Sequence, residues 1–359
     1  MAKAAKTVKV GIVGTKFAAD LHIKAYERCP GVEVVAAAGR DKGRLTEFAD
    51  AHGIPGRYTD YREMLEDPDI DLVSICVPNF LHHEVGLAIA AAGKHAICEK
   101  PLATTLEDAR EMVRAFEAAG RTLFYAEDWI FAPAIRRARE IIEEGAIGQV
   151  LFVKAKENHN GSHSPYAQTL EYCGGGSLIH LAIHPAGFIR WLTRQEVVEV
   201  IAKRSGGGER NLVHKKLEGE DWGAALLTME DGTYGFIEGN YITLGGMDDA
   251  IEIYGTKGSI KINVTLGSPI TVYSTVGYSY VVEKADMSVG WTHPAIDEES
   301  SLGYESEIAT FVKCVAEGAP APWGCRAVDG LAALAIIKAA YISAEQGKPV
   351  NPTALWKDS

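Results

Sequence analysis

The chain has 359 residues, 47% of them hydrophobic, and carries 36 basic against 48 acidic side chains, a formal net charge of −12. This length exceeds one ordinary domain, and the scattered basic residues argue against a nucleic-acid partner. The six cysteines show neither C-x-x-C pairs nor regular spacing, so we expect no disulfide framework. No apolar run is long enough to cross a bilayer, and the segment before the first apolar run is short and polar. We therefore expect a cytoplasmic protein with no membrane partner.

The first third of the chain alternates short apolar runs with segments of helical spacing. Strands are expected over residues 8–13, 32–38, 71–77, 96–98 and 123–126. Helices are expected over residues 17–28, 45–52, 83–92 and 106–119, the last one closed by Gly120. This alternation predicts a doubly wound parallel sheet with right-handed crossovers, the Rossmann arrangement. We place this first domain at residues 1–126.

From about residue 150 the pattern changes to strands that meet at short turns. Strands are expected over residues 150–156, 197–204, 224–230, 232–241, 250–254, 258–263 and 270–274. Turn pairs such as Asp231-Gly232 and Lys257-Gly258 indicate hairpins and an antiparallel sheet. Helices are expected over residues 176–192, 304–316 and 328–346. We predict an α+β domain over residues 127–359, with helices on one face of an open sheet and C-terminal helices free to pack on the first domain.

The turn after the first strand is a candidate dinucleotide site. The fingerprint is G-x-G-x-x-G, and aligning it on Gly14 places Lys16 and Ala19 where the second and third glycines belong. Ala19 suits close packing of helix on strand, whereas Lys16 must bring its backbone near the phosphates. The turn alone supports a dinucleotide site and an ordinary tight strand-helix turn about equally.

Glu99-Lys100-Pro101 follows an apolar strand. A lysine just past a buried parallel strand points into the crevice where open α/β sheets bind ligands. An ammonium there can meet a substrate hydroxyl. The alternative is a solvated surface lysine, and the preceding motifs must decide between the two.

Four motifs in order resemble the Gfo/Idh/MocA family, which includes glucose-fructose oxidoreductase and inositol dehydrogenase. They are the turn at residues 11–19, Val77-Pro78-Asn79-Phe80-Leu81-His82, the segment from Gly93-Lys94-His95 to Glu99-Lys100-Pro101, and residues 174–184. The resemblance covers nearly the whole chain. It implies an NAD(P)-dependent oxidoreductase that transfers a hydride between a nicotinamide and a hydroxyl-bearing carbon of a sugar, polyol or glycoside.

The resemblance also implies roles for single residues. Lys100 is expected to stabilise the developing alkoxide and to lie near the nicotinamide ribose, while His184 is expected to act as the base. The other reading of His184 is a core histidine bonded to a neighbour. Cofactor contacts are expected at Gly14, Lys16, Phe17, Ala18, Arg40, Cys76, Pro78, Asn79, His82, Glu99 and Lys100. Substrate contacts are expected at Lys100, Glu127, Trp129, His159, His163, His180 and His184.

One position departs from the family. The family commonly carries an aspartate four residues before the catalytic histidine, and this chain has His180 there. One helical turn would put His180 and His184 on the same helix face, so we place both in the catalytic set with Lys100. A neutral imidazole cannot supply the charge of an aspartate, so how the base is oriented stays open.

A polar segment in the second domain, Glu157 to His163, adds a carboxylate and two histidines. With His180 and His184 it offers four imidazoles, a set that a divalent metal could use. The alternative is a polar loop that hydrogen-bonds sugar hydroxyls. Because the family needs no metal, we predict none and assign His159 and His163 to substrate contact.

Glu127-Asp128-Trp129 lies where the fifth strand ends. An acid and an aromatic ring suit a sugar, whose hydroxyls need acceptors and whose C–H face stacks on rings. Equally, Asp128 could cap the next helix and Trp129 could pack between the domains.

Cofactor choice depends on the end of the second strand. NAD enzymes place a carboxylate there, but this chain has Gly39 followed by Arg40-Asp41. Arg40 could meet a 2′-phosphate, so NADP is slightly favoured over NAD; a shift of one residue would bring Asp41 into place and restore NAD. Alternatives to a dehydrogenase are a redox-neutral glycosidase or lyase with tightly bound NAD(H), a sugar-binding regulator and a metal-dependent enzyme. An exposed sheet face would favour a homodimer or homotetramer.

Overall fold

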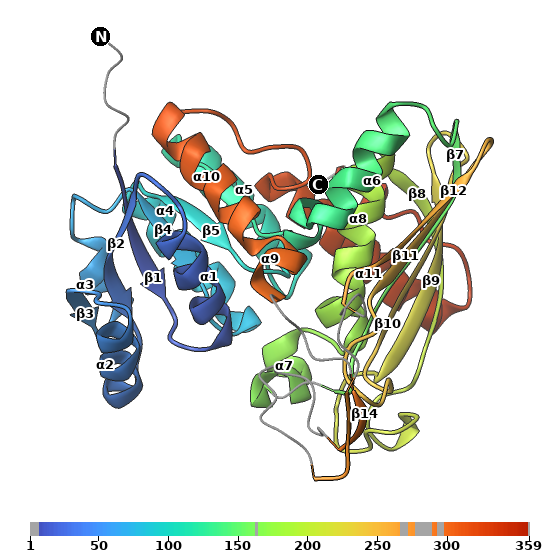
Figure 1. The fold of residues 1–359 in the computed structure, drawn as a ribbon, viewed down its shortest axis with the longest axis horizontal. Helices are drawn as coiled ribbons and strands as arrows, with labels where there is room; N and C mark the ends of the chain where they lie inside the picture. Colours follow the sequence, from blue (N-terminus) through green and yellow to red (C-terminus); the bar gives the residue numbers. More distant parts are fainter. Residues whose placement is uncertain (1–6, 162–163, 266–271, 277–288, 293–297, 358–359) are drawn as a thin grey trace. The chain divides into compact units, whose positions relative to one another are not determined.

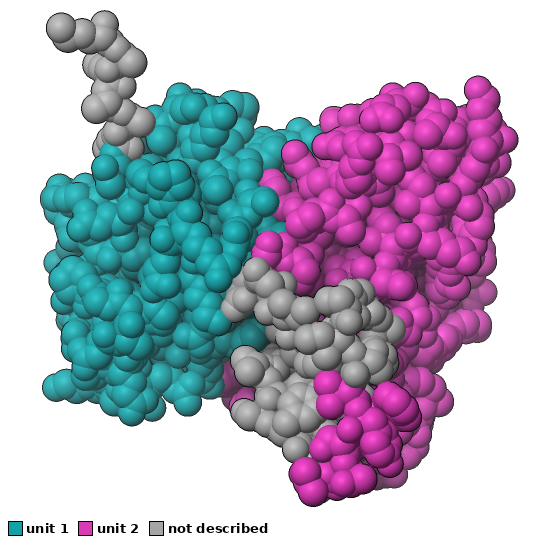
Figure 2. All heavy atoms as spheres, viewed as in Figure 1, with its two compact units in different colours: residues 1–128, 303–331 teal, residues 129–302, 332–359 magenta. Residues whose placement is uncertain are grey.

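Figure 1 shows the computed structural model of the chain, which describes residues 7–161, 164–265, 272–276, 289–292 and 298–357. The chain divides into two compact units. Unit 1 holds residues 1–128 and 303–331, and unit 2 holds residues 129–302 and 332–359 (Figure 2). A late segment of the chain therefore belongs to the same unit as the N-terminal third.

Six parallel strands form the sheet of unit 1, in the order β3-β2-β1-β4-β5-β6. Their bounds are β1 Val8–Val13, β2 Val32–Ala38, β3 Gly56–Tyr58, β4 Leu72–Ile75, β5 His95–Cys98 and β6 Leu123–Tyr125. The predicted doubly wound parallel sheet is confirmed. The sequence missed β3 because this edge strand of three residues is too short to show a hydrophobic pattern. The strand order reverses between β1 and β4, and open α/β sheets bind ligands at this switch point.

Helices connect these strands and a late helix joins them. Their bounds are α1 Phe17–Glu27, α2 Lys42–Ala51, α3 Tyr61–Leu65, α4 His82–Ala91, α5 Leu106–Ala119 and α10 Tyr304–Glu317. The ends of α5 follow from local chemistry, because the Thr105 hydroxyl accepts the Asp108 N–H at 3.1 Å and Gly120 adopts a φ of 61°. Helix α10 packs against α1, and Phe311 of α10 stacks on Phe124 of β6 with ring centroids 4.7 Å apart. This late helix therefore contributes to the core of unit 1.

Unit 2 is built on a second six-stranded sheet, in the order β12-β11-β7-β10-β9-β8. The bounds are β7 Val150–Asn158, β8 Val197–Arg204, β9 Trp222–Met229, β10 Tyr234–Asn240, β11 Ala250–Gly255 and β12 Ser259–Asn263. A separate pair is formed by β13 Val272–Ser274 and β14 Gly290–Thr292. Only the β7–β10 pairing in the six-stranded sheet is parallel, so the predicted mainly antiparallel sheet is confirmed.

The helical segment on this sheet differs from the single helix expected over residues 176–192. The chain makes one π-helical turn, Leu178–Ala182, before α8 runs over Ile183–Thr193. A Cβ at Gly239 of β10 would fall 2.6 Å from the Ser177 carbonyl oxygen, so the wide turn lies directly on the strand backbone. Such turns occur often at functional sites.

Helix α11 Ala327–Gln346 confirms the helix expected over residues 328–346. The sequence did not predict α6 Pro133–Glu143, α7 Leu170–Cys173, α9 Glu298–Leu302 and α12 Thr353–Trp356, which are short or begin within irregular segments. Helix α11 continues from unit 1 into unit 2 at residue 331. By length and composition alone α11 could cross a membrane, and 67% of its most apolar window is buried, as in the core helix of a globular protein.

Candidate active site

The turn after β1 brings two strand ends together at the switch point of unit 1. Gly14 has a φ of 124°, and a Cβ there would fall 2.1 Å from the Cys76 carbonyl oxygen just beyond β4. Only glycine allows this approach. Lys16 is the N-cap of α1, and Phe17 and Ala18 begin the helix, so their backbone N–H groups lie at its positive end. The turn thus has the geometry that a pyrophosphate needs, although its second fingerprint glycine is absent.

Glu99, which follows β5, is held in a buried ion pair. Its Oε1 lies 2.9 Å from His22 Nε2 of α1, and its Oε2 accepts the Lys100 N–H at 3.3 Å. The other ring nitrogen of His22 lies 3.1 Å from the Ser74 hydroxyl. Burial opposes a charge on His22, but Cys76 and Glu99 outweigh it and raise the pKa of His22 to about 10. Burial likewise opposes a charge on Glu99, yet His22 lowers the pKa of this carboxyl.

His82 joins the segment after β4 to the segment after β5. Its Nδ1 lies 2.8 Å from the Pro101 carbonyl oxygen and its Nε2 lies 3.0 Å from the Val77 carbonyl oxygen. Burial lowers the pKa of His82. The ring therefore lies between two backbone carbonyls, and in its neutral form it donates to one of them, so His82 links the segment of Pro78 and Asn79 to that of the half-buried Lys100.

The end of β2 carries no carboxylate directed at the turn. A Cβ at Gly39 would fall 2.9 Å from the Thr15 side chain. Arg40 is exposed, and Asp41 caps α2 by accepting the Arg44 N–H at 3.1 Å.

Two further carboxyl groups of unit 1 are buried. Glu127, beyond β6, and Glu307 of α10 both have 0% exposure. Burial, and after it Asp128 and Glu99, raises the pKa of Glu307 well above its ordinary value. Burial therefore favours the protonated form of Glu307.

His184 of α8 lies between an indole and a carboxylate of unit 2. Its ring stacks on Trp129 with centroids 5.7 Å apart and planes at 11°, and its Nε2 lies 3.8 Å from Glu157 Oε2. Trp129 is 2% exposed. The indole face next to His184 is therefore occupied by the imidazole.

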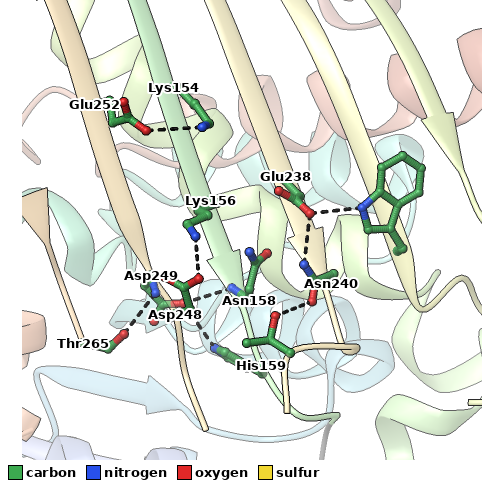
Figure 3. Close-up of polar contacts among 12 residues, drawn as sticks. Lys154, Lys156, Asn158, His159, Glu238, Asn240, Asp248, Asp249, Glu252 and Thr265 are labelled. Carbon is green, nitrogen blue, oxygen red and sulfur yellow. Dashed lines mark hydrogen bonds and ion pairs between the residues drawn. The ribbon is translucent and has the colours of Figure 1, made fainter. Parts of the chain in front are cut away.

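Glu157 continues into a buried row of alternating acids and imidazoles. Its Oε1 lies 3.3 Å from His159 Nε2, which in turn lies 3.8 Å from Asp249 Oδ1. Figure 3 shows His159 directed at Asp249, whose Oδ1 also accepts the Asn158 N–H at 3.0 Å. Within the described residues, Glu157 Oε2 has no hydrogen-bond partner. This oxygen is an unused acceptor beside His184.

His180 contacts a different group from His184. Its Nδ1 hydrogen-bonds the Tyr241 hydroxyl from within the π-helical turn. Burial raises the pKa of Tyr241 well above its ordinary value, so the phenol stays protonated. The remaining predicted residue, His163, lies outside the described residues.

Sequence reasoning missed His22, Asp249 and Tyr241 and left Glu157 out of the site. Glu157 could have been found, because it shares the buried face of β7 with Val153 and Ala155, where a carboxylate needs a partner. His22 lies on the apolar face of α1 and carries no such signal.

The parallel sheet and the glycine turn against Cys76 define unit 1 as a dinucleotide-binding unit, which the chain joins to a mainly antiparallel α+β unit. Residues 8–127 match the family described as the oxidoreductase family with an NAD-binding Rossmann fold, and residues 135–261 match the GFO/IDH/MocA C-terminal domain. The chain belongs to the GFO/IDH/MocA oxidoreductase family.

Similar proteins share nearly the full length of the chain. An uncharacterized oxidoreductase of Bacillus subtilis (strain 168) is 30% identical over 96% of this chain and 97% of its own. The myo-inositol 2-dehydrogenase of Thermotoga maritima is 26% identical over 96% of this chain and 98% of its own. The crystal structure of GenD2 from gentamicin A biosynthesis, in complex with NAD, superposes with a TM-score of 0.89 at 24% identity and covers 98% of this chain and 97% of that one. The predicted family and the predicted class, a nicotinamide-dependent oxidoreductase, are confirmed.

Proposed function

We propose that the protein is a dehydrogenase that oxidises a hydroxyl-bearing carbon of a sugar, polyol or glycoside with a nicotinamide cofactor. The observation that carries this proposal is His184, held between Trp129 and an unused oxygen of Glu157. Relatives named for inositol and for 1,5-anhydro-D-fructose support the substrate class.

The residues of unit 1 fit the cofactor. Gly14 lets the turn lie against the Cys76 backbone, where a Cβ would clash, and the α1 N-terminus at Lys16, Phe17 and Ala18 offers N–H groups for the pyrophosphate. When bound, the nicotinamide accepts the hydride of the carbinol C–H. Further contacts are proposed at Cys76, Pro78, Asn79, His82 and Glu99.

The proton of the substrate hydroxyl goes to His184 Nε2 in this proposal. Glu157 Oε2 lies on that nitrogen's side and stabilises the imidazolium that forms. The buried row of Glu157, His159 and Asp249 holds two acidic groups and one imidazole. An imidazolium at His184 would give the second acidic group a partner, which favours the transfer.

Lys100 is proposed to stabilise the alkoxide, in line with the family resemblance. An ammonium favours the developing negative oxygen over the neutral hydroxyl, so its contribution is made mainly in the transition state. Glu127, His159 and His180 are proposed as substrate contacts, with Trp129 as the wall that fixes His184. We propose no metal.

We further propose that NADP is accepted at least as well as NAD. Gly39 supplies no carboxylate for a ribose 2′-hydroxyl, and Asp41 is engaged as the α2 cap, whereas Arg40 is exposed and can meet a 2′-phosphate. A preference for NAD in kcat/KM would contradict this.

The experiment is a nicotinamide-absorbance assay with NAD and NADP across sugars, polyols and glycosides. We expect alcohol-dependent reduction that Lys100→Met abolishes while the protein stays folded. Lys203→Met, an exposed lysine on β8, is the matched control. No reduction with any alcohol would overturn the proposal, and glycoside cleavage without net reduction would support the redox-neutral alternative.

A homo-oligomer formed through the outer face of the second sheet is also proposed. Neighbouring strands align Phe236, Leu226 and Ile201 in one row, and Phe152 stacks on Tyr254 at 6.1 Å in the next. Leu226 is 54% exposed and Ile201 43%, which favours burial against a second copy. Light scattering of the wild type and of Leu226→Glu tests this.

All six cysteines are free thiols, which supports a cytoplasmic location.

A further inference from the structure

A pocket with a volume of about 520 Å³ lies within unit 2. Its polar walls are formed by Asn160, Gln168, His214, Lys215, Lys216 and Tyr241. This volume is in the range of sites that hold a small molecule of several rings. It therefore has room for more of a substrate than the ring that reacts.

The segment that carries the two lysines is fixed by a buried network. The Asp221 carboxylate, 0% exposed, accepts the N–H groups of Leu212, Val213 and His214 at 3.0, 2.7 and 3.0 Å. The Asn211 side chain donates to the carbonyls of His214, Leu217 and Gly219 at 3.1, 3.0 and 2.8 Å. The pocket wall is thus preorganised, which reduces the entropy cost of binding.

The wall is basic although the chain as a whole is acidic, with a net charge of −12. No carboxylate lines the pocket among the described residues. The Lys215 ammonium donates to the carbonyl oxygens of Glu209 and Asn211 and so helps to fix the segment. Lys216 is exposed, and none of the hydrogen bonds and ion pairs found among the described residues involves it. Its ammonium is available to a ligand.

Tyr241 connects this pocket to the candidate site. Its hydroxyl binds His180 Nδ1, and its carbonyl accepts a hydrogen bond from His214 Nε2 at 2.7 Å. Because His214 donates from Nε2 to this carbonyl, its Nδ1 is the ring nitrogen left to contact a sugar hydroxyl. A molecule in the pocket would lie against the tyrosine that holds His180.

We propose that this pocket binds a part of the substrate that does not react and that carries an anionic group. The substrate class is then an acidic saccharide, in which a carboxylate or a phosphate meets Lys216. An ammonium selects either anion by charge, and Asn160 and Gln168 supply donors and acceptors for hydroxyl groups. This inference rests on the proposed function, because it identifies the substrate of that enzyme.

The test compares kcat/KM for a methyl glycoside, the corresponding methyl uronide and the corresponding sugar phosphate. We expect an acidic compound to be preferred, and Lys216→Met to lower its kcat/KM by about fivefold or more, mainly through KM, with the neutral glycoside unchanged. Which acidic compound is preferred identifies the anion. Lys203→Met, a lysine of β8 outside the pocket, should change neither.

Equal use of acidic and neutral compounds by the wild type would overturn the inference, as would an equal loss for both in Lys216→Met. Calorimetric titration of the protein with methyl uronide and with inorganic phosphate is independent of turnover. Binding that weakens in Lys216→Met and at high salt supports the pocket even if no alcohol is oxidised. Absence of binding to either anion, with neutral glycosides turned over, leaves the proposed function standing and removes this inference.

Discussion

Each unit buries a histidine against a glutamate, but the two pairs differ in how completely the carboxylate is used. In unit 1, Glu99 lies 2.9 Å from His22 and also accepts the Lys100 N–H. In unit 2, Glu157 lies 3.3 Å from His159 and 3.8 Å from His184, and its Oε2 has no hydrogen bond among the described residues. The first carboxylate is fully engaged, and the second keeps an open acceptor.

This difference separates a pair that holds structure from a pair suited to proton transfer. A closely bonded buried ion pair keeps both of its charges, because neutralising one partner would leave the charge of the other partner buried and uncompensated. A carboxylate with a spare oxygen beside an imidazole can answer a change in that imidazole's charge. We therefore expect substitutions in unit 1 to affect stability and those in unit 2 to affect the rate.

The largest expected effect is on turnover, in Glu157→Gln. The amide keeps the shape of the side chain but cannot stabilise an imidazolium at His184, so kcat should fall by about 10² or more with a smaller change in KM. Steady-state kinetics with either cofactor measure this, and Glu252→Gln on neighbouring β11 is the control. Unchanged kcat would place Glu157 outside the reaction, and restoration by Glu157→Asp would support a charge-based role.

Replacing His22 should chiefly reduce stability. His22→Gln leaves Glu99 buried without its cation, which should cost about 3–5 kcal/mol in the free energy of unfolding. Urea unfolding measures this loss, and adding Glu99→Gln should recover part of it. The pair of the half-buried His52 and the exposed Glu27 is the control, because Glu27 stays in contact with water and His52→Gln should cost only about 1 kcal/mol. Equal losses for the two histidines would remove the contrast between pair types.

The pair of unit 1 also predicts a pH window. Because the pKa of His22 is raised to about 10 from an ordinary 6.5, its contribution is complete below the ordinary value and lost as pH rises through about 10. The lowered pKa of Glu99 makes its contribution complete above its ordinary value of 4.5 and lost as pH falls below that. The stability gap between wild type and His22→Gln should therefore be widest between about pH 4.5 and 6.5, and it should narrow as pH rises from 6.5 towards about 10. A gap that stays constant up to pH values above about 10 would contradict the assignment.

The smallest expected effect is a gain. Burial favours the protonated form of Glu307 in the folded protein, so its contribution to stability declines as pH rises above its ordinary pKa of 4.5. Glu307→Gln removes this decline and should raise the free energy of unfolding by about 1 kcal/mol at neutral pH. Thermal unfolding should show no gain near pH 4, where both states hold the proton. A loss of stability at neutral pH would mean that Glu307 is charged and paired.

More of the fold than of the candidate site could be predicted from the sequence. Regular alternation predicted five of the six strands in the sheet of unit 1, and the turn pair Asp231-Gly232 predicted a hairpin of unit 2. The order of motifs identified the family and pointed to Lys100 and His184. The side chains that contact these two residues or their neighbours, such as Glu99 beside Lys100, come from segments far apart in the sequence. His22 reaches Glu99 across 77 residues, and no local pattern records such a distance.

The departure from the family at His180 shows why the contacts of a site residue cannot be predicted from the sequence alone. The sequence left open how His184 is oriented once the expected aspartate is absent. Glu157, on a strand before the helix, lies beside His184, while His180 binds Tyr241 instead. Both contacts depend on how β7 and β10 pack under the π-helical turn, which three-dimensional packing decides.

The return of residues 303–331 to unit 1 has a consequence for how the protein is made. Phe311 stacks on Phe124, and the Cys325 carbonyl accepts the Tyr125 N–H at 2.8 Å. These contacts of β6 can form only after residues 311 and 325 have been synthesised. On the ribosome, the N-terminal third emerges long before those partners exist. Unit 2 has most of its residues available by then, so we expect unit 1, although it starts the chain, to finish folding only after synthesis passes residue 331. A fragment that stops near residue 128 should consequently need a chaperone or aggregate.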